Sequence, residues 1–384
     1  MISVTFVIHT GTVKEMISHL NYKNSQLKGR YLSLKHLEKT LDQWSDHLSH
    51  DLKGISVNGS IIPVYYFGQG QQTILMWSQM HGNESTTTKG LVDFVGFLKD
   101  DRLEAKALLS QCTFVVLPVL NPDGAKAYTR FNANNIDLNR DFQDFSQVET
   151  VFLKKVFDRV KPDFCFNLHD QRTIFGLKNP VKPASISFLS PAADTERSIT
   201  PSRAIAMQLI VEMHSSLSKF IPHQIGRFND TFNNQCVGDF FQELGVPTIL
   251  FEAGHFQEDY QREVSRAFVF KALLSAANAI ATKSYSNQEV NDYFSIPENQ
   301  KNFTDIGVVN AHLLNQEIPE NITVGFQYKE VLSEAEVVFI PELVNFFEKD
   351  KMNFHKIIDL LDFKSDLQST VFQNIKEKII LFKG

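Results

Sequence analysis

Strand-length apolar runs alternate with amphipathic stretches over about the first 280 residues of the chain. The apolar runs are bounded by turn residues and lie at 57–67, 73–80, 113–120, 164–168 and 248–251. Apolar residues recur at helical spacing in 14–50, 86–99, 146–160, 202–219 and 258–282. Such alternation is typical of an α/β fold, because strands buried on both faces read as continuous apolar runs. The pattern predicts a mixed, mostly parallel twisted sheet flanked by helices.

Two polar segments interrupt this pattern. Asn121–Gly124 has the composition of a turn, in which proline fixes φ and glycine tolerates a positive φ. The segment 284–292 is polar and is predicted to be a domain boundary. Three strand-like runs follow it, at 306–311, 322–328 and 337–340. We therefore expect a larger α/β domain over 1–285, including the N-terminal helical segment, and a small, partly β C-terminal domain over 286–384.

The composition is that of a globular protein and argues against a nucleic-acid partner. Hydrophobic residues make up 43% of the chain and charged residues 21%, close to average values. The formal net charge is -6 and no basic stripe is visible, whereas nucleic-acid binding needs a basic face. The 33 phenylalanines predict a heavily aromatic core. Cys112, Cys165 and Cys236 lie far apart without metal-type Cys-x-x-Cys spacing, and we interpret them as buried small apolar residues.

Export and membrane signals are weak in the sequence. The N-terminal run Met1–Thr10 is apolar, but it lacks a preceding positive charge and a small-residue cleavage site. No run of about 18 apolar residues occurs. We expect a cytoplasmic protein without a membrane partner. The one reservation is that a wrongly chosen start codon would hide a leader peptide. The oligomeric state leaves no signature in the chain.

The first candidate chemistry is the segment His81–Glu84, which directly follows one apolar run, while His169 directly follows another. A short-spaced His and Glu with one distant His is the arrangement in which a catalytic zinc keeps its fourth position open for water. In open α/β sheets, ligands bind beyond the carboxyl ends of the strands. The pattern predicts one zinc ion held by His81, Glu84 and His169. The same spacing recurs at His255–Glu258, and an isolated His-x-x-Glu is more often an ordinary surface pair, so the strand ends beside the motif carry this prediction.

The most specific stretch is Asn121–Phe142, NPDGAKAYTRFNANNIDLNRDF. Together with the zinc-ligand candidates and the strand Thr248–Glu252, it resembles the zinc metallocarboxypeptidase family of carboxypeptidase A/D-like peptidases. The resemblance covers roughly residues 55–280 and marks the chain as an atypical bacterial-type member. It implies a zinc-dependent hydrolase that cleaves a C-terminal peptide bond with a metal-activated water.

Four roles complete that chemistry. Glu252, at the end of an apolar strand, is placed to take a proton from the attacking water and deliver it to the leaving amine, although a turn-capping glutamate is the alternative. The resemblance implies that Arg130 stabilises the developing oxyanion, and a solvated loop arginine is the alternative. It implies that Asn139 and Arg140 bind the terminal carboxylate of the substrate. Asp137 matches an aspartate that accepts a hydrogen bond from His81, and a plain turn aspartate is the alternative.

The chain departs from the family at the residue that covers the substrate. Family members often supply a tyrosine about twenty residues before the catalytic glutamate, yet no tyrosine lies between Tyr128 and Tyr260. We expect Phe228, Phe232 or another loop residue in that neighbourhood. A phenylalanine packs over a substrate but donates no hydrogen bond, so the side-chain specificity stays open.

Two further groups lie near the predicted site. His255 follows Glu252 by three residues, and we interpret it as a loop histidine that flanks the site, with contact to the metal crevice as the alternative. The run Asp170–Arg172 follows His169 and is a candidate lining of the pocket, where Arg172 either holds an acidic substrate group or is an ordinary loop arginine.

Three functions fit these residues. The leading hypothesis is a zinc metallocarboxypeptidase that acts on a peptide or peptide-like substrate with a free C-terminal carboxylate. A related zinc amidohydrolase, acting on acylated amino acids or cell-wall peptides, needs the same metal chemistry with different pocket residues. A non-catalytic zinc-binding module is the third, and the complete ligand set with Glu252 argues against it.

Overall fold

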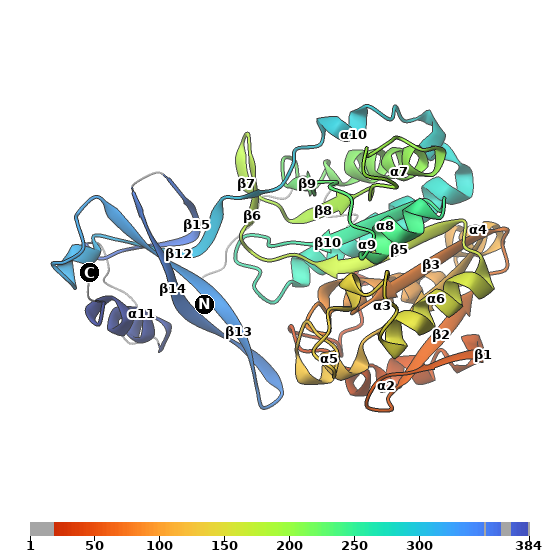
Figure 1. Cartoon of the computed structure of the whole chain (residues 1–384), viewed down its shortest axis with the longest axis horizontal. Helices are drawn as coiled ribbons and strands as arrows, with labels where there is room; N and C mark the ends of the chain where they lie inside the picture. The colour runs from red at the N-terminus through yellow and green to blue at the C-terminus, as the bar shows by residue number, and fades with distance from the viewer. Residues whose placement is uncertain (1–18, 349–350, 362–369, 383–384) are drawn as a thin grey trace.

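An eight-stranded twisted sheet forms the centre of the larger part of the molecule (Figure 1). The structure, a computed structural model, describes residues 19–348, 351–361 and 370–382, so the run Met1–Thr10 lies outside the described residues. The strands, in the order in which they lie side by side, are β1 (Leu48–Ile55), β2 (Ile61–Phe67), β4 (Cys112–Leu117), β3 (Gln72–Ser78), β5 (Phe164–Asp170), β10 (Thr248–Ala253), β8 (Ile186–Leu189) and β9 (Ile225–Arg227).

The centre of this sheet is parallel and its flanks are antiparallel. β3 pairs in parallel with β4 and with β5, and β5 pairs in parallel with β10. β1, β2 and β4 pair antiparallel at one side, and β8 runs antiparallel to β10 at the other. The predicted fold class, a mixed and mostly parallel sheet flanked by helices, is confirmed.

Helices cover both faces of the sheet. They are α2 (Leu34–Asp42), α3 (Thr86–Leu98), α4 (Leu103–Gln111), α5 (Pro122–Ala127), α6 (Val148–Val160), α7 (Pro201–Leu217), α8 (Val237–Glu243) and α9 (Glu263–Thr282). On β3, Ile74 and Met76 pack into a core shared with α3, α7 and α9, whereas Leu75 and Trp77 pack into a second core with α6 and α8. Because successive side chains of a strand point to opposite faces, covering both faces requires an uninterrupted apolar run.

One helix of the described residues is long and apolar enough to cross a membrane. This helix is α9, and 67% of its apolar window is buried inside the protein. It packs against α3 and α7 in the first core.

Two local predictions need correction. Within the described part of 14–50, residues 19–20, α2 and the 3₁₀ turn Ser45–His47 are helical, but the predicted helical stretch ends earlier than expected, because Leu48 begins the edge strand β1. The predicted turn Asn121–Gly124 is the start of α5, because the Asn121 side chain accepts a hydrogen bond from the Gly124 N–H and Pro122 occupies the first helical turn. Proline is well suited to that position, where its missing N–H is not needed.

The remaining elements follow α9 in the chain, except β6 and β7, which lie between β5 and β8 in sequence. A small sheet joins β11 (Gln300–Lys301), β6 (Phe175–Lys178) and β7 (Val181–Pro183), and α10 (Asp292–Ser295) precedes β11 in the chain. A four-stranded sheet follows, in the order β14 (Glu336–Glu348), β13 (Ile322–Ser333), β12 (Phe303–Val309) and β15 (Asn353–Asp359). α11 (Thr370–Ile380) packs on it around a third apolar core that includes Val324, Phe326 and Ile375. The domain boundary at residues 285 and 286 stays a prediction.

Candidate metal centre and active site

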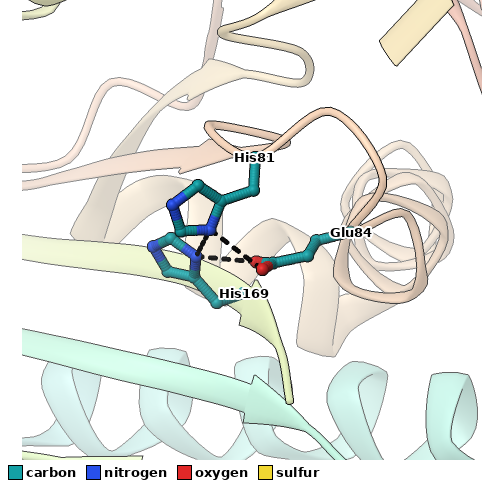
Figure 2. A group of neighbouring side chains, drawn as sticks. All are labelled: His81, Glu84 and His169. Atoms are coloured by element: carbon teal, nitrogen blue, oxygen red, sulfur yellow. Dashed lines mark hydrogen bonds and ion pairs between the residues drawn. The ribbon is translucent and has the colours of Figure 1, made fainter. Parts of the chain in front are cut away.

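The predicted zinc ligands lie where two neighbouring parallel strands end. Ser78, the last residue of β3, pairs with Leu168 of β5, and His169 is the residue after Leu168. The segment 79–85 between β3 and α3, which we call the metal loop, carries His81 and Glu84. Figure 2 shows the three side chains pointing toward one another. The parallel pairing therefore brings together residues that are 85 to 88 positions apart.

The ligand atoms of these residues converge closely. Nδ1 of His81 lies 2.9 Å from Oε1 of Glu84, Nδ1 of His169 lies 2.8 Å from Oε2 of Glu84, and the two Nδ1 atoms are 3.0 Å apart. The three residues are the metal-compatible group found among the described residues. Ligands about 2.0–2.1 Å from a tetrahedral zinc stand roughly 3.3 Å apart, so this spacing suits the ion with little adjustment. Two imidazole nitrogens and a carboxylate are also the donor types that zinc prefers.

The other ring nitrogen of His81 is held by Asp137. Nε2 lies 2.9 Å from Oδ1 of Asp137, so a proton on Nε2 leaves the Nδ1 lone pair directed at the metal position. Arg130 joins the same carboxylates, because its Nε donates to Oδ2 of Asp137 at 3.0 Å and its Nη1 donates to Oε1 of Glu84 at 3.3 Å. The Arg130 side chain is 39% exposed, which places it at the open side of the site.

The charges of this cluster are strongly coupled. Burial lowers the pKa of His81, but the charge of Glu84 and the hydrogen bond with Asp137 outweigh it, and the net pKa is raised. Burial raises the pKa of Glu84, but the two histidines outweigh it and hold the pKa well below its usual range. For His169, burial dominates and its pKa is lowered. The lowered pKa values of Glu84 and His169 favour the forms that bind a metal, whereas the raised pKa of His81 favours a proton that a bound metal ion would displace.

The metal loop is fixed by its neighbours on both sides. Asp170, directly after His169, accepts hydrogen bonds from the backbone N–H groups of Thr86 at 2.9 Å and Thr87 at 3.1 Å, which begin α3. Gly82 packs so tightly against α5 that a Cβ there would lie 2.0 Å from the carbonyl carbon of Gly124. Asp170 therefore caps a helix and holds the loop in place. The sequence predicts Asp170 only as a residue of the pocket lining, and its position after His169 does not indicate that it caps α3.

Glu252 stands beside His169 on the adjacent strand. The two residues are direct partners in the parallel pairing of β10 and β5. Oε2 of Glu252 is buried and has no hydrogen-bond partner among the described residues. Burial, followed by the negative charges of Glu84 and Asp170, raises the pKa of Glu252 well above its usual range. A buried carboxyl without a polar partner is costly unless a ligand or a cation lies beside it.

Asn139 and Arg140 lie in a 3₁₀ turn that begins at Asp137. The Asp137 side chain accepts a hydrogen bond from the Asn139 N–H at 2.9 Å, which fixes the turn next to His81. Oδ1 of Asn139 accepts from the Val237 N–H at 3.0 Å at the start of α8. The exposed Arg140 places Nη1 2.6 Å from the Asn139 carbonyl oxygen and 3.1 Å from Sγ of Cys236. The pair is therefore near the metal site, with the guanidinium open to solvent.

The other candidates are spread around the site rather than in it. His255 is 1% exposed and packs on the rings of Tyr260 and His355, at 4.7 and 4.2 Å, outside the metal-compatible group. Arg172 is exposed. Phe228 packs against Phe175 of β6, with ring centroids 5.0 Å apart.

The three cysteines are all free, as expected. Cys112 and Cys165 are buried, whereas Cys236 is half-buried beside Arg140 and is therefore not simply a core residue.

Comparison with known proteins agrees with this geometry. Residues 36–158 match the family model described as zinc carboxypeptidase. The chain is thus similar to zinc carboxypeptidases over these residues. Its matched segment includes the metal loop, Arg130 and the Asp137–Arg140 turn, and His169 and Glu252 lie beyond it in sequence but beside it in space.

Two Trichophyton proteins are similar to part of this chain in sequence. Carboxypeptidase 2 of Trichophyton tonsurans is 28% identical over 163 residues, which are 39% of this chain and 30% of that protein. Carboxypeptidase 2 of Trichophyton equinum is 31% identical over 121 residues, which are 30% of this chain and 22% of that protein. The chain thus matches less than a third of the length of these relatives.

Solved structures resemble about two thirds of this chain in fold. A metallo-carboxypeptidase from Pseudomonas aeruginosa has a TM-score of 0.52 at 17% identity, covering 65% of this chain and 69% of that one. Bovine thrombin-activatable fibrinolysis inhibitor has a TM-score of 0.52 at 15% identity, covering 68% of this chain and 99% of that one. At these identities the likeness concerns the fold.

Proposed function

We propose that this protein is a zinc-dependent carboxypeptidase that releases the C-terminal residue of a peptide or peptide-like substrate. One observation carries the proposal: Nδ1 of His81, Nδ1 of His169 and the carboxylate of Glu84 converge on one point, and Glu252 is the strand partner of His169. Three ligands and a free carboxyl are the parts needed for metal-assisted hydrolysis.

One zinc ion bound by His81, Glu84 and His169 would polarise the scissile carbonyl and lower the pKa of a water molecule. Glu252 accepts the proton of the attacking water and passes it to the leaving amine, and a cation held by the three ligands would oppose the rise that burial causes in the pKa of Glu252. The Oε2 atom of Glu252 supports this role, because it has no hydrogen-bond partner in the described part of the chain and therefore no such structural bond to give up.

Arg130 supplies a fixed positive charge at the open side of the site. Its hydrogen bonds to Asp137 and Glu84 hold the guanidinium in place before substrate arrives. A charge held in this way stabilises the developing oxyanion without reorganising during the reaction.

Asn139 and Arg140 bind the terminal carboxylate of the substrate. Arg140 is exposed, and a guanidinium forms two parallel hydrogen bonds with a carboxylate, which gives geometric specificity as well as affinity. This pair makes the enzyme an exopeptidase, because an internal peptide bond offers no carboxylate at that position.

The test is a comparison of matched peptides with free and amidated C-termini, assayed with zinc and after chelation. We expect hydrolysis of the free peptide only, with loss of activity after chelation and recovery on addition of zinc. Equal cleavage of the two peptides contradicts an exopeptidase. Hydrolysis of acylated amino acids without hydrolysis of peptides favours the amidohydrolase alternative, in which the absence of a tyrosine between Tyr128 and Tyr260 reflects a different pocket.

A further inference from the structure

A carboxylate from the C-terminal sheet contacts segments that flank the metal loop. Glu330 of β13 accepts a hydrogen bond from the Tyr128 hydroxyl, and its other oxygen lies 3.3 Å from Nη1 of Arg30. Tyr128 is 8% exposed and Arg30 is 6% exposed, so both are largely shielded from solvent. In Figure 1 the hairpin of β13 and β14 extends from the C-terminal sheet toward α5, which ends next to Tyr128.

Tyr128 is joined to the metal loop through the residue that follows it. The carbonyl oxygen of Thr129 accepts a hydrogen bond from the Asn83 N–H at 3.1 Å, and Asn83 lies between His81 and Glu84 in sequence. The next residue is Arg130, whose guanidinium donates to Glu84. A displacement of Tyr128 is therefore transmitted to the metal loop by one backbone hydrogen bond and one ion pair.

Arg30 is joined to the other end of the same loop. Its carbonyl oxygen accepts a hydrogen bond from the hydroxyl of Ser85, the residue after Glu84. Nε of Arg30 has no hydrogen-bond partner among the described residues, so the guanidinium depends heavily on Glu330 for compensation. A buried charge that loses its partner is strongly unfavourable, and the chain around it rearranges.

We propose that Glu330 is a positioning residue for the metal loop. Its two oxygens hold Tyr128 and Arg30 at a fixed separation, and these two residues hold Asn83 and Ser85 on either side of Glu84. The C-terminal sheet thereby sets the geometry of the zinc ligands without contacting the substrate. The activity part of this inference rests on the proposed carboxypeptidase function, whereas the zinc-affinity part does not.

The experiment compares Glu330→Ala, Glu330→Gln and Tyr128→Phe in the full-length protein. Tyr128→Phe removes only the hydroxyl and guards against an Ala variant that fails to fold. Glu342→Gln is the matched control, because Glu342 lies on the same hairpin, is 49% exposed and pairs with Lys329. The measurements are the zinc dissociation constant, by competition with a chromogenic chelator, and amide hydrogen exchange at Asn83.

We expect Glu330→Ala to raise the zinc dissociation constant about tenfold, the lower end of the range for residues that orient metal ligands. Amide exchange at Asn83 should accelerate in the same variant. Glu330→Gln and Tyr128→Phe should show smaller increases in the zinc dissociation constant and in exchange at Asn83. Glu342→Gln should match the parent in both. With a cleavable peptide, kcat should fall about tenfold while KM changes by less than about twofold.

Folded Glu330 and Tyr128 variants with parental zinc affinity and parental Asn83 exchange would overturn the positioning role. If the parent hydrolyses no peptide at all, the proposed function fails, and the zinc and exchange measurements still decide the role of Glu330.

Discussion

The buried zinc-ligand cluster and the exposed Asn139–Arg140 pair are held by the chain in different ways. His81 and His169 are each 2% exposed, and Glu252 is paired in register with His169, so regular strands and a capped helix fix these groups. Asn139 and Arg140 lie on a short 3₁₀ turn, and Arg140 is open to solvent. The difference fits the roles proposed for the two groups. Atoms proposed to act on the reacting bond need a rigid, dry setting, whereas a group proposed to bind an arriving substrate must be accessible to solvent.

Replacing Glu252 with Gln should cause the largest effect, and it tests the buried half of this comparison. The amide keeps the shape of the side chain but cannot accept the proton of water, so we expect kcat to fall by about 10²- to 10⁴-fold. Zinc binding should persist, because Glu252 is not in the metal-compatible group. Steady-state kinetics and metal analysis of the same preparation provide the two measurements.

A Glu252→Gln protein that binds zinc and hydrolyses as fast as the parent would refute the role of this residue as a base. Loss of zinc in the variant would instead show that the carboxyl supports the ligands. The two outcomes separate a chemical from a structural role within the buried cluster.

The strand ends that carry the metal site could be predicted because their signal is local. Ile74–Trp77 must be apolar on both faces, since each face packs into its own core, and His81 follows this run closely. By contrast, Leu48 continues the helical spacing of the preceding residues but becomes an edge strand, where pairing with β2 outweighs the local preference.

Contacts between distant segments could not be predicted in the same way. Asp170 caps α3 across 83 to 84 residues, and Glu330 meets Tyr128 across 202 residues. No spacing rule connects such residues, because their meeting depends on the packing of whole elements. The candidate ligand set could nevertheless be predicted from the sequence, since parallel pairing brings the ends of adjacent strands together.

Replacing Arg140 with Ala tests the exposed half and should have a smaller effect than Glu252→Gln. Losing a charge-assisted pair with the terminal carboxylate should raise KM for a peptide about 10- to 100-fold, while kcat changes less. The ratio of activity on the free peptide to activity on the amidated peptide should also decrease in this variant. Arg159→Ala is a suitable control, because Arg159 is also an exposed arginine and lies on α6, to which no binding role is assigned.

An Arg140→Ala enzyme that keeps the parental KM and the parental preference would move the carboxylate-binding role to another residue. If kcat falls as strongly as in Glu252→Gln, the distinction between the buried cluster and the exposed pair breaks down.

The smallest expected effect is on stability and concerns His355, a buried histidine without a proposed catalytic role that contacts the loop after β5. Nε2 of His355 lies 2.8 Å from the Thr173 carbonyl oxygen, and its ring packs on His255. Burial lowers the pKa of His355 from 6.5 to about 4. Between these two pH values the unfolded chain takes up a proton that the folded chain does not, so stability present above pH 6.5 is lost as the pH falls toward 4.

Replacing His355 with Gln should therefore flatten the pH dependence of stability in this window. We expect the parent to lose about 1 to 2 kcal/mol more than the variant, after allowance for solvent screening of a partly buried ring. Thermal unfolding at a series of pH values measures this, and His50→Gln is the control because His50 is exposed. Peptide hydrolysis at neutral pH should be unchanged, because His355 contacts none of the zinc ligands. If the stability of parent and variant depends on pH with the same slope, protonation of His355 is not what destabilises the protein in acid. If the variant loses peptide hydrolysis at neutral pH, His355 also contributes to activity, as Glu330 of the same sheet is proposed to do.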